Sequence, residues 1–195
     1  MQLHKHDVVA KAASILDNYG IADLTMRRLA RELDVTPGAL YWHFASKQEL
    51  LGAVADHVLA PACADQPAAG WRHRIEIVCR ALRDALLSHT DGAELVSASV
   101  AAGRSEAMAL ILSQLGAAAV EAGMDPGQAA LAARSIVYYV LGFTADEQSR
   151  LQWDAAGVDV PEPSPTENPS TRFAFGLQLL TYGIGAEIDA GARLR

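Results

Sequence analysis

Apolar residues recur every three or four positions along most of the chain, which is the period of an amphipathic helix. Thr25 and Thr36 each precede such a stretch and are residue types that cap helix N-termini, while Gly20 ends the first stretch. Pro37 stands at a first helical position, where its missing N–H costs nothing. The pattern therefore predicts three short helices, over residues 8–19, 26–34 and 37–44.

The remainder of the chain is also predicted to be helical. Residues 46–49, Ser-Lys-Gln-Glu, have the pattern of a capping box and begin a longer helix that ends before Pro61. Residues 154–170 contain four prolines and four acids but no base, so we expect a mobile loop there. No stretch has the alternating pattern of a strand, and the expected fold class is all-α. Further helices are predicted over residues 71–88, 106–122, 126–149 and 173–188.

The second and third helices are joined by a very short turn, which is typical of a helix-turn-helix. In that motif one helix braces the DNA backbone and the next lies in the major groove. Residues 1–45 are therefore predicted to form a three-helix DNA-binding domain, and residues 46–60 a connecting helix. Residues 61–195 form a separate C-terminal domain.

Charge is unevenly distributed along the 195 residues, of which 51% are hydrophobic. The formal net charge is −7, which argues against a chain that binds nucleic acid over its whole surface. Residues 1–50 carry no net charge, however, and the stretch from Leu24 to Lys47 contains four basic and two acidic residues. Any nucleic-acid contact is therefore expected in this N-terminal part.

Cys63 and Cys79 form neither a CxxC pair nor a metal-binding spacing, so a reducing compartment is expected. No apolar run approaches the length that spans a membrane, and the first residues lack the apolar core of a signal peptide. We expect a cytoplasmic protein without a metal or cofactor.

The stretch TPGALYWHF, residues 36–44, places three aromatic rings and an imidazole close together. Consecutive residues on a helix point in different directions, so these side chains cannot all enter one core. On a recognition helix, Leu40 and Phe44 would face inward and the small residues at its start would approach base edges. Tyr41, Trp42 and His43 would then donate hydrogen bonds to phosphate. The alternative is that Tyr41 and Trp42 pack against the following helix.

Residues 24–51, LTMRRLARELDVTPGALYWHFASKQELL, resemble the DNA-binding domain of the TetR family of bacterial repressors. Shared features are the threonine-capped helix with surface arginines, the Leu-Tyr-x-His-Phe ending and the lysine in the capping box. Residues 85–96 and 172–184 resemble the tetracycline-repressor subclass. The predicted DNA-binding residues are Thr25, Arg27, Arg28, Thr36, Pro37, Gly38, Ala39, Tyr41, Trp42, His43 and Lys47.

This resemblance implies a homodimer that binds a palindromic operator in double-stranded DNA. In such proteins, the long helix after residues 123–126 and the last helix pair with their symmetry mates in a four-helix bundle. Gly176, Gly183 and Gly185 are costly inside a helix, and close approach between helices would offset that cost. Packing within one chain is the alternative explanation for these glycines.

The resemblance also implies a small-molecule effector bound in the C-terminal domain. Tetracycline repressors hold a magnesium–drug complex with an imidazole, and Val96 occupies the matching position here. Cys63 and Val78 match other polar drug contacts. Since a hard cation needs oxygen or imidazole ligands, we expect a largely apolar effector and no metal. The predicted ligand-binding residues are His57, Cys63, Val78, Leu82, Val96 and Val100; His57 could equally be a surface residue.

Two other functions compete with a ligand-responsive transcriptional repressor. A small helical enzyme could use His57, His89 and nearby acids, but no HExxH, paired DxxxD or phosphate-binding glycine loop is present. A dimerisation module that no longer binds DNA would have no reason to keep basic and aromatic donors on one face. Asp146 and Glu147 could meet a ligand from the partner subunit, or form a solvated or interface acid pair. We predict that the chain is not an enzyme.

Overall fold

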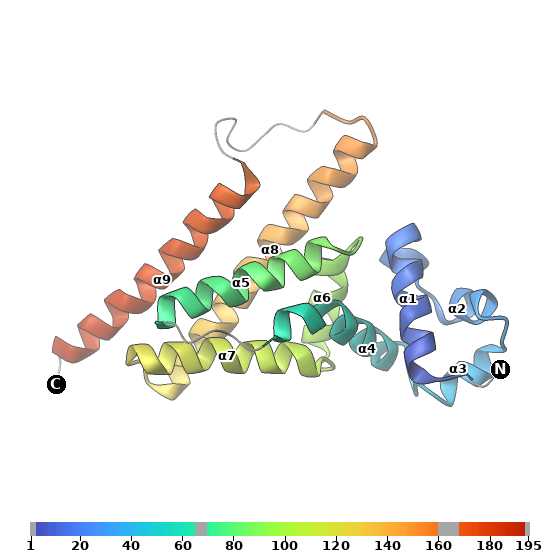
Figure 1. The fold of residues 1–195 in the computed structure, drawn as a ribbon, viewed down its shortest axis with the longest axis horizontal. Helices are drawn as coiled ribbons and strands as arrows, with labels where there is room; N and C mark the ends of the chain where they lie inside the picture. Colours follow the sequence, from blue (N-terminus) through green and yellow to red (C-terminus); the bar gives the residue numbers. More distant parts are fainter. Residues whose placement is uncertain (1–2, 65–69, 160–167, 194–195) are drawn as a thin grey trace.

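The computed structural model describes residues 3–64, 70–159 and 168–193, and every regular element in those ranges is a helix. This confirms the predicted all-α class. Figure 1 shows the N-terminal helices gathered at one end of an elongated molecule, with the C-terminus at the opposite end.

The N-terminal helices pack around buried apolar residues that belong to the same core cluster as those of the C-terminal helices. Leu16, Leu29, Leu40 and Phe44 are at most 2% exposed, so the predicted inward positions of Leu40 and Phe44 are confirmed. The elements are α1 (Lys5–Tyr19), the 3₁₀ helix η1 (Ile21–Asp23), α2 (Met26–Glu32) and α3 (Pro37–Tyr41).

Three boundaries in this region differ from the prediction. Helix α2 ends at Glu32 rather than at residue 34. Helix α1 begins at Lys5 rather than residue 8, because the Asp7 carboxylate accepts the backbone N–H of His4 at 3.0 Å and fixes the first turn. Helix α3 ends at Tyr41 rather than Phe44. The N–H groups of His43 and Phe44 both donate to the Leu40 carbonyl at 2.9 Å, which closes a turn and directs Phe44 into the core.

Helix α4 (Lys47–Leu59) connects the two parts of the molecule. It packs against α1 on one side and against α6 and α7 on the other. A side chain at Gly52 would overlap the backbone oxygen of Arg104, so this glycine permits the close approach of α4 to the segment that follows α6. Helix α4 is therefore in close contact with the C-terminal part of the molecule.

The C-terminal part contains one helix that the sequence analysis did not assign. Helix α6 follows Asp91, whose backbone is left-handed at φ 54°, and it lacks the serine or threonine cap that marks α2, α3 and α4. The elements are η2 (Ala60–Cys63), α5 (Trp71–Leu87), α6 (Gly92–Ala101), α7 (Glu106–Ala122), α8 (Pro126–Ala155) and α9 (Pro169–Arg193).

The loop predicted over residues 154–170 is shorter than expected. Helix α8 continues to Ala155, six residues beyond the predicted end, and α9 already begins at Pro169. Proline fits the first turn of a helix, so Pro169 begins α9 rather than extending the loop. Residues 160–167 lie outside the described part of the chain.

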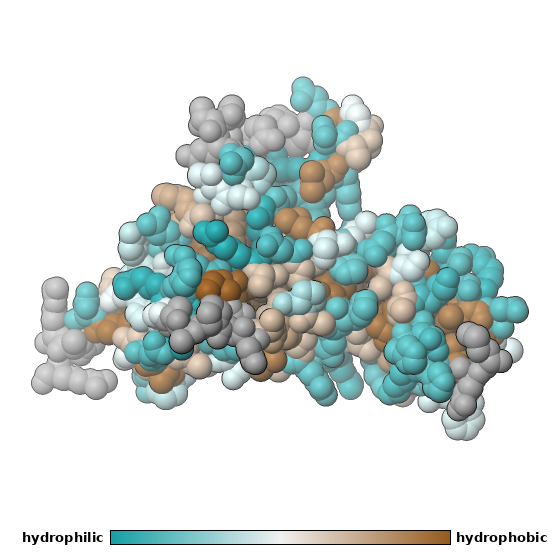
Figure 2. Space-filling model, viewed as in Figure 1, coloured by the Kyte–Doolittle hydropathy of each residue, from teal (hydrophilic) through white to brown (hydrophobic). Residues whose placement is uncertain are grey.

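Helices α8 and α9 keep large hydrophobic side chains on their outer faces. Figure 2 shows hydrophobic residues on the surface over these two helices, among more polar neighbours. We call the exposed large aromatic and aliphatic side chains of these two helices the α8–α9 face. Its seven members are between 55% and 68% exposed: Leu131, Tyr138, Leu151, Trp153, Phe175, Leu179 and Tyr182.

Among the described residues, no single helix is long and apolar enough to cross a membrane. One pair, Gly92–Ala101 and Glu106–Ala122, meets that test only when taken together, and its two helices are bent by 85°.

Candidate nucleic-acid interface and effector site

The turn between α2 and α3 is built from short-range hydrogen bonds. The Thr25 hydroxyl accepts the Arg28 N–H at 3.1 Å, and the Thr36 hydroxyl accepts the Ala39 N–H at 3.3 Å, so both predicted caps are confirmed. Asp34 adopts a left-handed backbone at φ 53°, which aspartate tolerates better than most residues. The Val35 N–H donates to the Ala30 carbonyl at 3.0 Å and closes the turn.

Helix α3 presents its start and its end to solvent. Thr36, Pro37 and Gly38 are exposed, and Ala39 is half-buried. Tyr41 is 53% exposed and Trp42 90% exposed. Trp42 therefore does not pack against α4, which removes that alternative for the largest ring of the segment. His43, which lies between Trp42 and Phe44 in the sequence, is half-buried.

Two adjacent arginines of α2 have different environments. Arg27 is exposed. The guanidinium of Arg28 contacts the Asp23 carboxylate at 2.5 Å and lies 3.7 Å from the centroid of the Tyr19 ring. Arg28 is thus held by contacts within its own domain, and its assignment to DNA stays a prediction.

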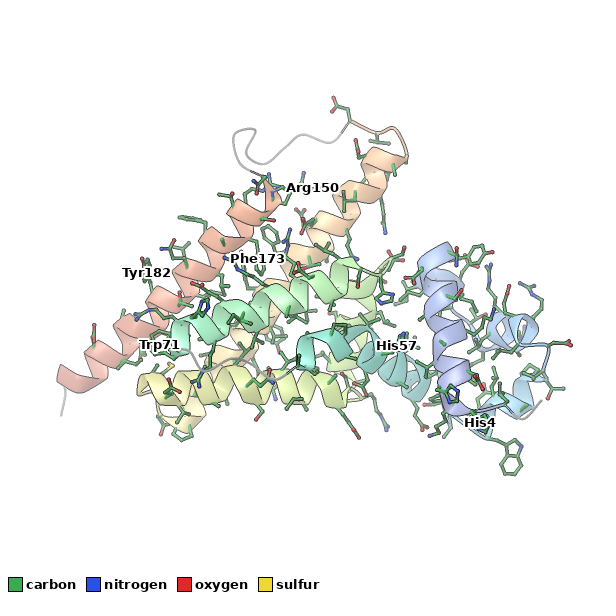
Figure 3. The ribbon with its side chains drawn as sticks, in the orientation of Figure 1. His4, His57, Trp71, Arg150, Phe173 and Tyr182 are labelled. Carbon is green, nitrogen blue, oxygen red and sulfur yellow. The ribbon has the colours of Figure 1, made fainter. Side chains whose placement is uncertain are left out.

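Lys47 follows Ser46 at the start of α4. The Ser46 hydroxyl accepts the Glu49 N–H at 3.2 Å, as a capping box requires. The Glu49 carboxylate accepts the N–H of Ala45 at 2.8 Å, one residue before the expected position. Lys5 lies 3.8 Å from Glu49, which brings the first turn of α1 beside this cap, where Figure 3 labels His4. Lys5 and Lys47 against Glu49 leave one net positive charge at this cap, which we call the basic edge.

The predicted effector residues divide between the core and the surface. Val78, Leu82 and Val96 are buried in the hydrophobic core that α5, α6, α7 and α8 share, and Val100 is partly buried against it. Cys63 is half-buried, and its thiol lies 3.7 Å from the Ala107 carbonyl. These residues are therefore apolar core residues, and their assignment to a ligand site stays a prediction.

His57 lies apart from that core. Its side chain is exposed on α4, and its ring centroid is 6.3 Å from that of His89 in the α5–α6 turn (Figure 3). His57 therefore belongs to the junction between α4 and this turn. Asp91 begins α6 in the same turn, so the expectation that His89 and Asp91 shape a helix end is confirmed.

Helix α8 carries polar groups on its buried side that were not predicted from the sequence. Thr144 is fully buried, and its hydroxyl has no hydrogen-bond partner among the described residues. Gln148 lies one turn further along and bonds to the α5–α6 turn. The sequence signal for them was available. Thr144 and Gln148 are four positions apart and continue the buried apolar stripe of Ile136, Val137 and Val140.

Arg83 and Glu147 form a buried ion pair. Two guanidinium nitrogens of Arg83 donate to the two carboxylate oxygens of Glu147 at 2.9 and 2.6 Å. Asp146, in contrast, pairs with Arg150 on the exposed side of α8 at 2.7 Å. The two adjacent acids thus have separate structural partners within the chain.

The two thiols lack the features of a reactive cysteine. Burial raises the pKa of both Cys63 and Cys79, so both remain protonated at neutral pH. No cluster of three or more histidine, cysteine, aspartate or glutamate side chains in the described ranges is arranged to hold a metal ion.

Comparisons with known proteins match this arrangement. Residues 8–54 match the family model for bacterial regulatory proteins of the tetR family, and residues 63–159 match the tetracyclin repressor-like C-terminal domain. The tetracycline repressor protein class E of Escherichia coli is 30% identical over 96% of this chain and 93% of its own length. The chain belongs to the TetR family.

Solved structures of TetR-family members extend the match. The crystal structure of Mycobacterium smegmatis BioQ is 63% identical, with a TM-score of 0.89 over 95% of this chain and 99% of BioQ. A structure of BioQ with its natural double-stranded DNA operator is 62% identical, with a TM-score of 0.84 over 95% and 99% of the two chains. This TetR-family protein is a DNA-binding transcriptional repressor and not an enzyme, as predicted.

Proposed function

We propose that this repressor binds a palindromic operator as a homodimer and is released from it by a small, largely apolar effector. The proposal rests on the presence of two exposed surfaces at different places on the same molecule. One contains the exposed residues of α3 at one end of the molecule, and the other is the α8–α9 face.

The DNA contact is assigned to the surface around α3. Thr36, Gly38 and Ala39 leave room for the backbone to approach base edges, while Tyr41 and Trp42 project from the end of the helix. The likeness to BioQ, which was crystallised with its operator, supports this assignment.

The dimer contact is assigned to the α8–α9 face. Leu131 and Tyr138 are seven residues apart on α8, and Phe175, Leu179 and Tyr182 follow the spacing of a bundle seam on α9. A groove of about 390 Å³ runs between the two helices beside these residues. Two-fold pairing here would place the recognition helices about 34–36 Å apart, one turn of duplex.

The helical glycines of α9 serve different contacts. A side chain at Gly176 would overlap the Tyr139 ring, and one at Gly185 would approach the Arg72 guanidinium, so these two glycines pack within the chain. A side chain at Gly183 meets no atom of its own chain within 4 Å. We therefore assign only Gly183 to the contact between subunits.

The effector site is assigned to the core between α5 and α6, the helix that contains Val96. Leu82, Val96 and Val100 provide an apolar wall, with Val78 and Cys63 beyond it. The unpaired hydroxyl of Thr144 on α8 offers one hydrogen bond to a ligand in this core. A bound effector would shift α4 and change the separation of the two recognition helices, which weakens operator binding.

Substitutions on the DNA surface test the function. Tyr41→Ala and Lys47→Ala are expected to weaken binding to all duplexes alike and to flatten its salt dependence, because both side chains are assigned to phosphate. Arg27→Ala should relax base preference by about 1–3 kcal/mol, the value of a bidentate contact with guanine. Fluorescence anisotropy with a duplex selected from a random pool, at several salt concentrations, measures both effects.

Arg80→Ala is the matched control for this experiment, because Arg80 is exposed on α5, outside the proposed surface. It should leave affinity and salt dependence unchanged. Wild-type binding by the Tyr41, Lys47 and Arg27 variants would remove α3 and the start of α4 from the DNA interface.

Tetracycline tests the effector assignment. Val96 provides no cation ligand, and each unpaired polar group buried against this wall costs about 1–3 kcal/mol. We expect magnesium and tetracycline together to leave the complex with the selected duplex intact, with or without a chelator. Release at micromolar drug that a chelator reverses would overturn the assignment, since the site would then hold a metal by other residues.

A further inference from the structure

The DNA-binding helices are attached to the rest of the molecule at a second place besides α4. The turn Ser88–Asp91 between α5 and α6, here called the clamp, lies against the C-terminal end of α1 (Figure 1). A cleft of about 420 Å³, lined by clamp residues together with Asp17, Gln148 and Gln152, marks this junction.

Four hydrogen bonds join the clamp to the DNA-binding domain. The Asp17 carboxylate accepts from the His89 imidazole at 3.0 Å and from the Thr90 N–H at 3.3 Å. The Thr90 hydroxyl donates to the Asp17 carbonyl at 2.9 Å. The Ile21 N–H donates to the Asp91 carboxylate at 2.9 Å. These bonds hold the end of α1 and the start of η1.

The same clamp is fixed to α8 by two glutamines. The amide of Gln148, which is 8% exposed, donates to the carbonyls of Leu86 and His89 at 3.0 and 2.7 Å, and its oxygen accepts the Ala93 N–H at 3.1 Å. The Gln152 amide donates at 2.5 Å to the Asp91 carboxylate oxygen that does not bond to Ile21. Buried and fully bonded, Gln148 leaves the clamp little freedom to move.

We infer that Asp17 and the clamp are positioning residues for operator binding: they fix the angle of the DNA-binding domain on the body. A domain held only by α4 could tilt about that helix, whereas a domain held at two points cannot. The clamp therefore restricts the separation of the two recognition helices in the dimer. None of these residues needs to touch DNA, and the inference rests on the proposed binding as a homodimer.

The test compares Asp17→Ala with Asn18→Ala on the next residue of α1. The Asn18 side chain donates only to Ser14, within the same helix. The probes are a palindromic duplex selected by the wild-type protein from a random pool, and two derivatives whose centres are one base pair longer or shorter. Affinity is measured at several salt concentrations.

Asp17→Ala is expected to bind the selected duplex about tenfold more weakly, which equals about 1.4 kcal/mol. Its preference for the selected spacing over the two derivatives should fall, because a tilting domain reaches all three. Its salt dependence should stay that of the wild type, since no phosphate contact is removed. Asn18→Ala should match the wild type in every respect.

Gln152→Ala provides a second route, because it removes one of the two glutamine contacts that hold the clamp to α8 without a change in the DNA-binding domain. It replaces Asp17→Ala in the test if that variant does not fold, and it should show a smaller loss of spacing preference in the same direction, because the Gln148 bonds remain. Wild-type affinity and spacing preference in the folded clamp variants would overturn the inference, as would an equal loss in Asn18→Ala. A wild-type protein indifferent to spacing would instead contradict the homodimer proposal.

Discussion

Replacement of Arg83 by methionine is expected to lower the free energy of unfolding by about 3–5 kcal/mol, the cost of an uncompensated buried charge. The side chains of Arg83 and Glu147 are only 10% and 12% exposed, so water replaces the lost partner poorly. The Arg83 guanidinium also lies 5.2 Å from the Phe173 ring and 3.4 Å from the Ser170 hydroxyl, both on α9. Urea denaturation at fixed protein concentration measures the loss.

The double variant Arg83→Met with Glu147→Leu is the control, because it removes both charges together. An apolar pair of similar volume is often as stable as the ion pair it replaces, so this variant should lie within about 1 kcal/mol of the wild type. An Arg83→Met variant with wild-type stability would mean that Glu147 finds another partner or water, and that the pair does not hold α5, α8 and α9 together.

Gly183→Leu is expected to weaken dimerisation at least 30-fold. Overpacking costs about 1–3 kcal/mol at each site, and a two-fold axis brings the substitution into the interface twice. Each 1.4 kcal/mol is about tenfold in the dissociation constant. The isolated subunit should be slightly more stable, by about 0.5–1 kcal/mol, because leucine favours a helix more than glycine does. Sedimentation equilibrium measures the first effect and denaturation of the monomer the second.

The same substitution at Gly116 on α7 is the matched control. A side chain there also meets no atom within 4 Å, and α7 is outside the α8–α9 face. Gly116→Leu should keep the wild-type dissociation constant. A Gly183→Leu protein that dimerises as tightly as the wild type would place Gly183 outside the subunit interface.

The features predicted correctly depend on short stretches of sequence. Thr25, Thr36 and Ser46 cap the helices they precede, because the N–H groups they bond lie three residues further along. The burial of Leu40 and Phe44 follows from the spacing of apolar residues in the same stretch.

The features missed depend on three-dimensional contacts that no short sequence pattern specifies. Arg28 is held by Asp23 and Tyr19, five and nine residues earlier in the chain, whereas the adjacent Arg27 is exposed. Glu147 was grouped with Asp146, because its partner Arg83 is 64 residues earlier. Helix α6 was missed because Asp91 begins it through contacts with Ile21 and Gln152 rather than through a local cap.

The elongated shape also makes the molecule an electric dipole. Residues 1–50, which contain the helices at one end, carry no net charge, and the whole formal charge of −7 falls in residues 51–195. In the field of a DNA duplex, the acidic body is repelled while the basic edge at Lys47 is attracted. Collisions are thereby biased toward the orientation that places α3 nearest the groove. Dissolved salt screens this field, so the rate of the first encounter should fall as ionic strength rises.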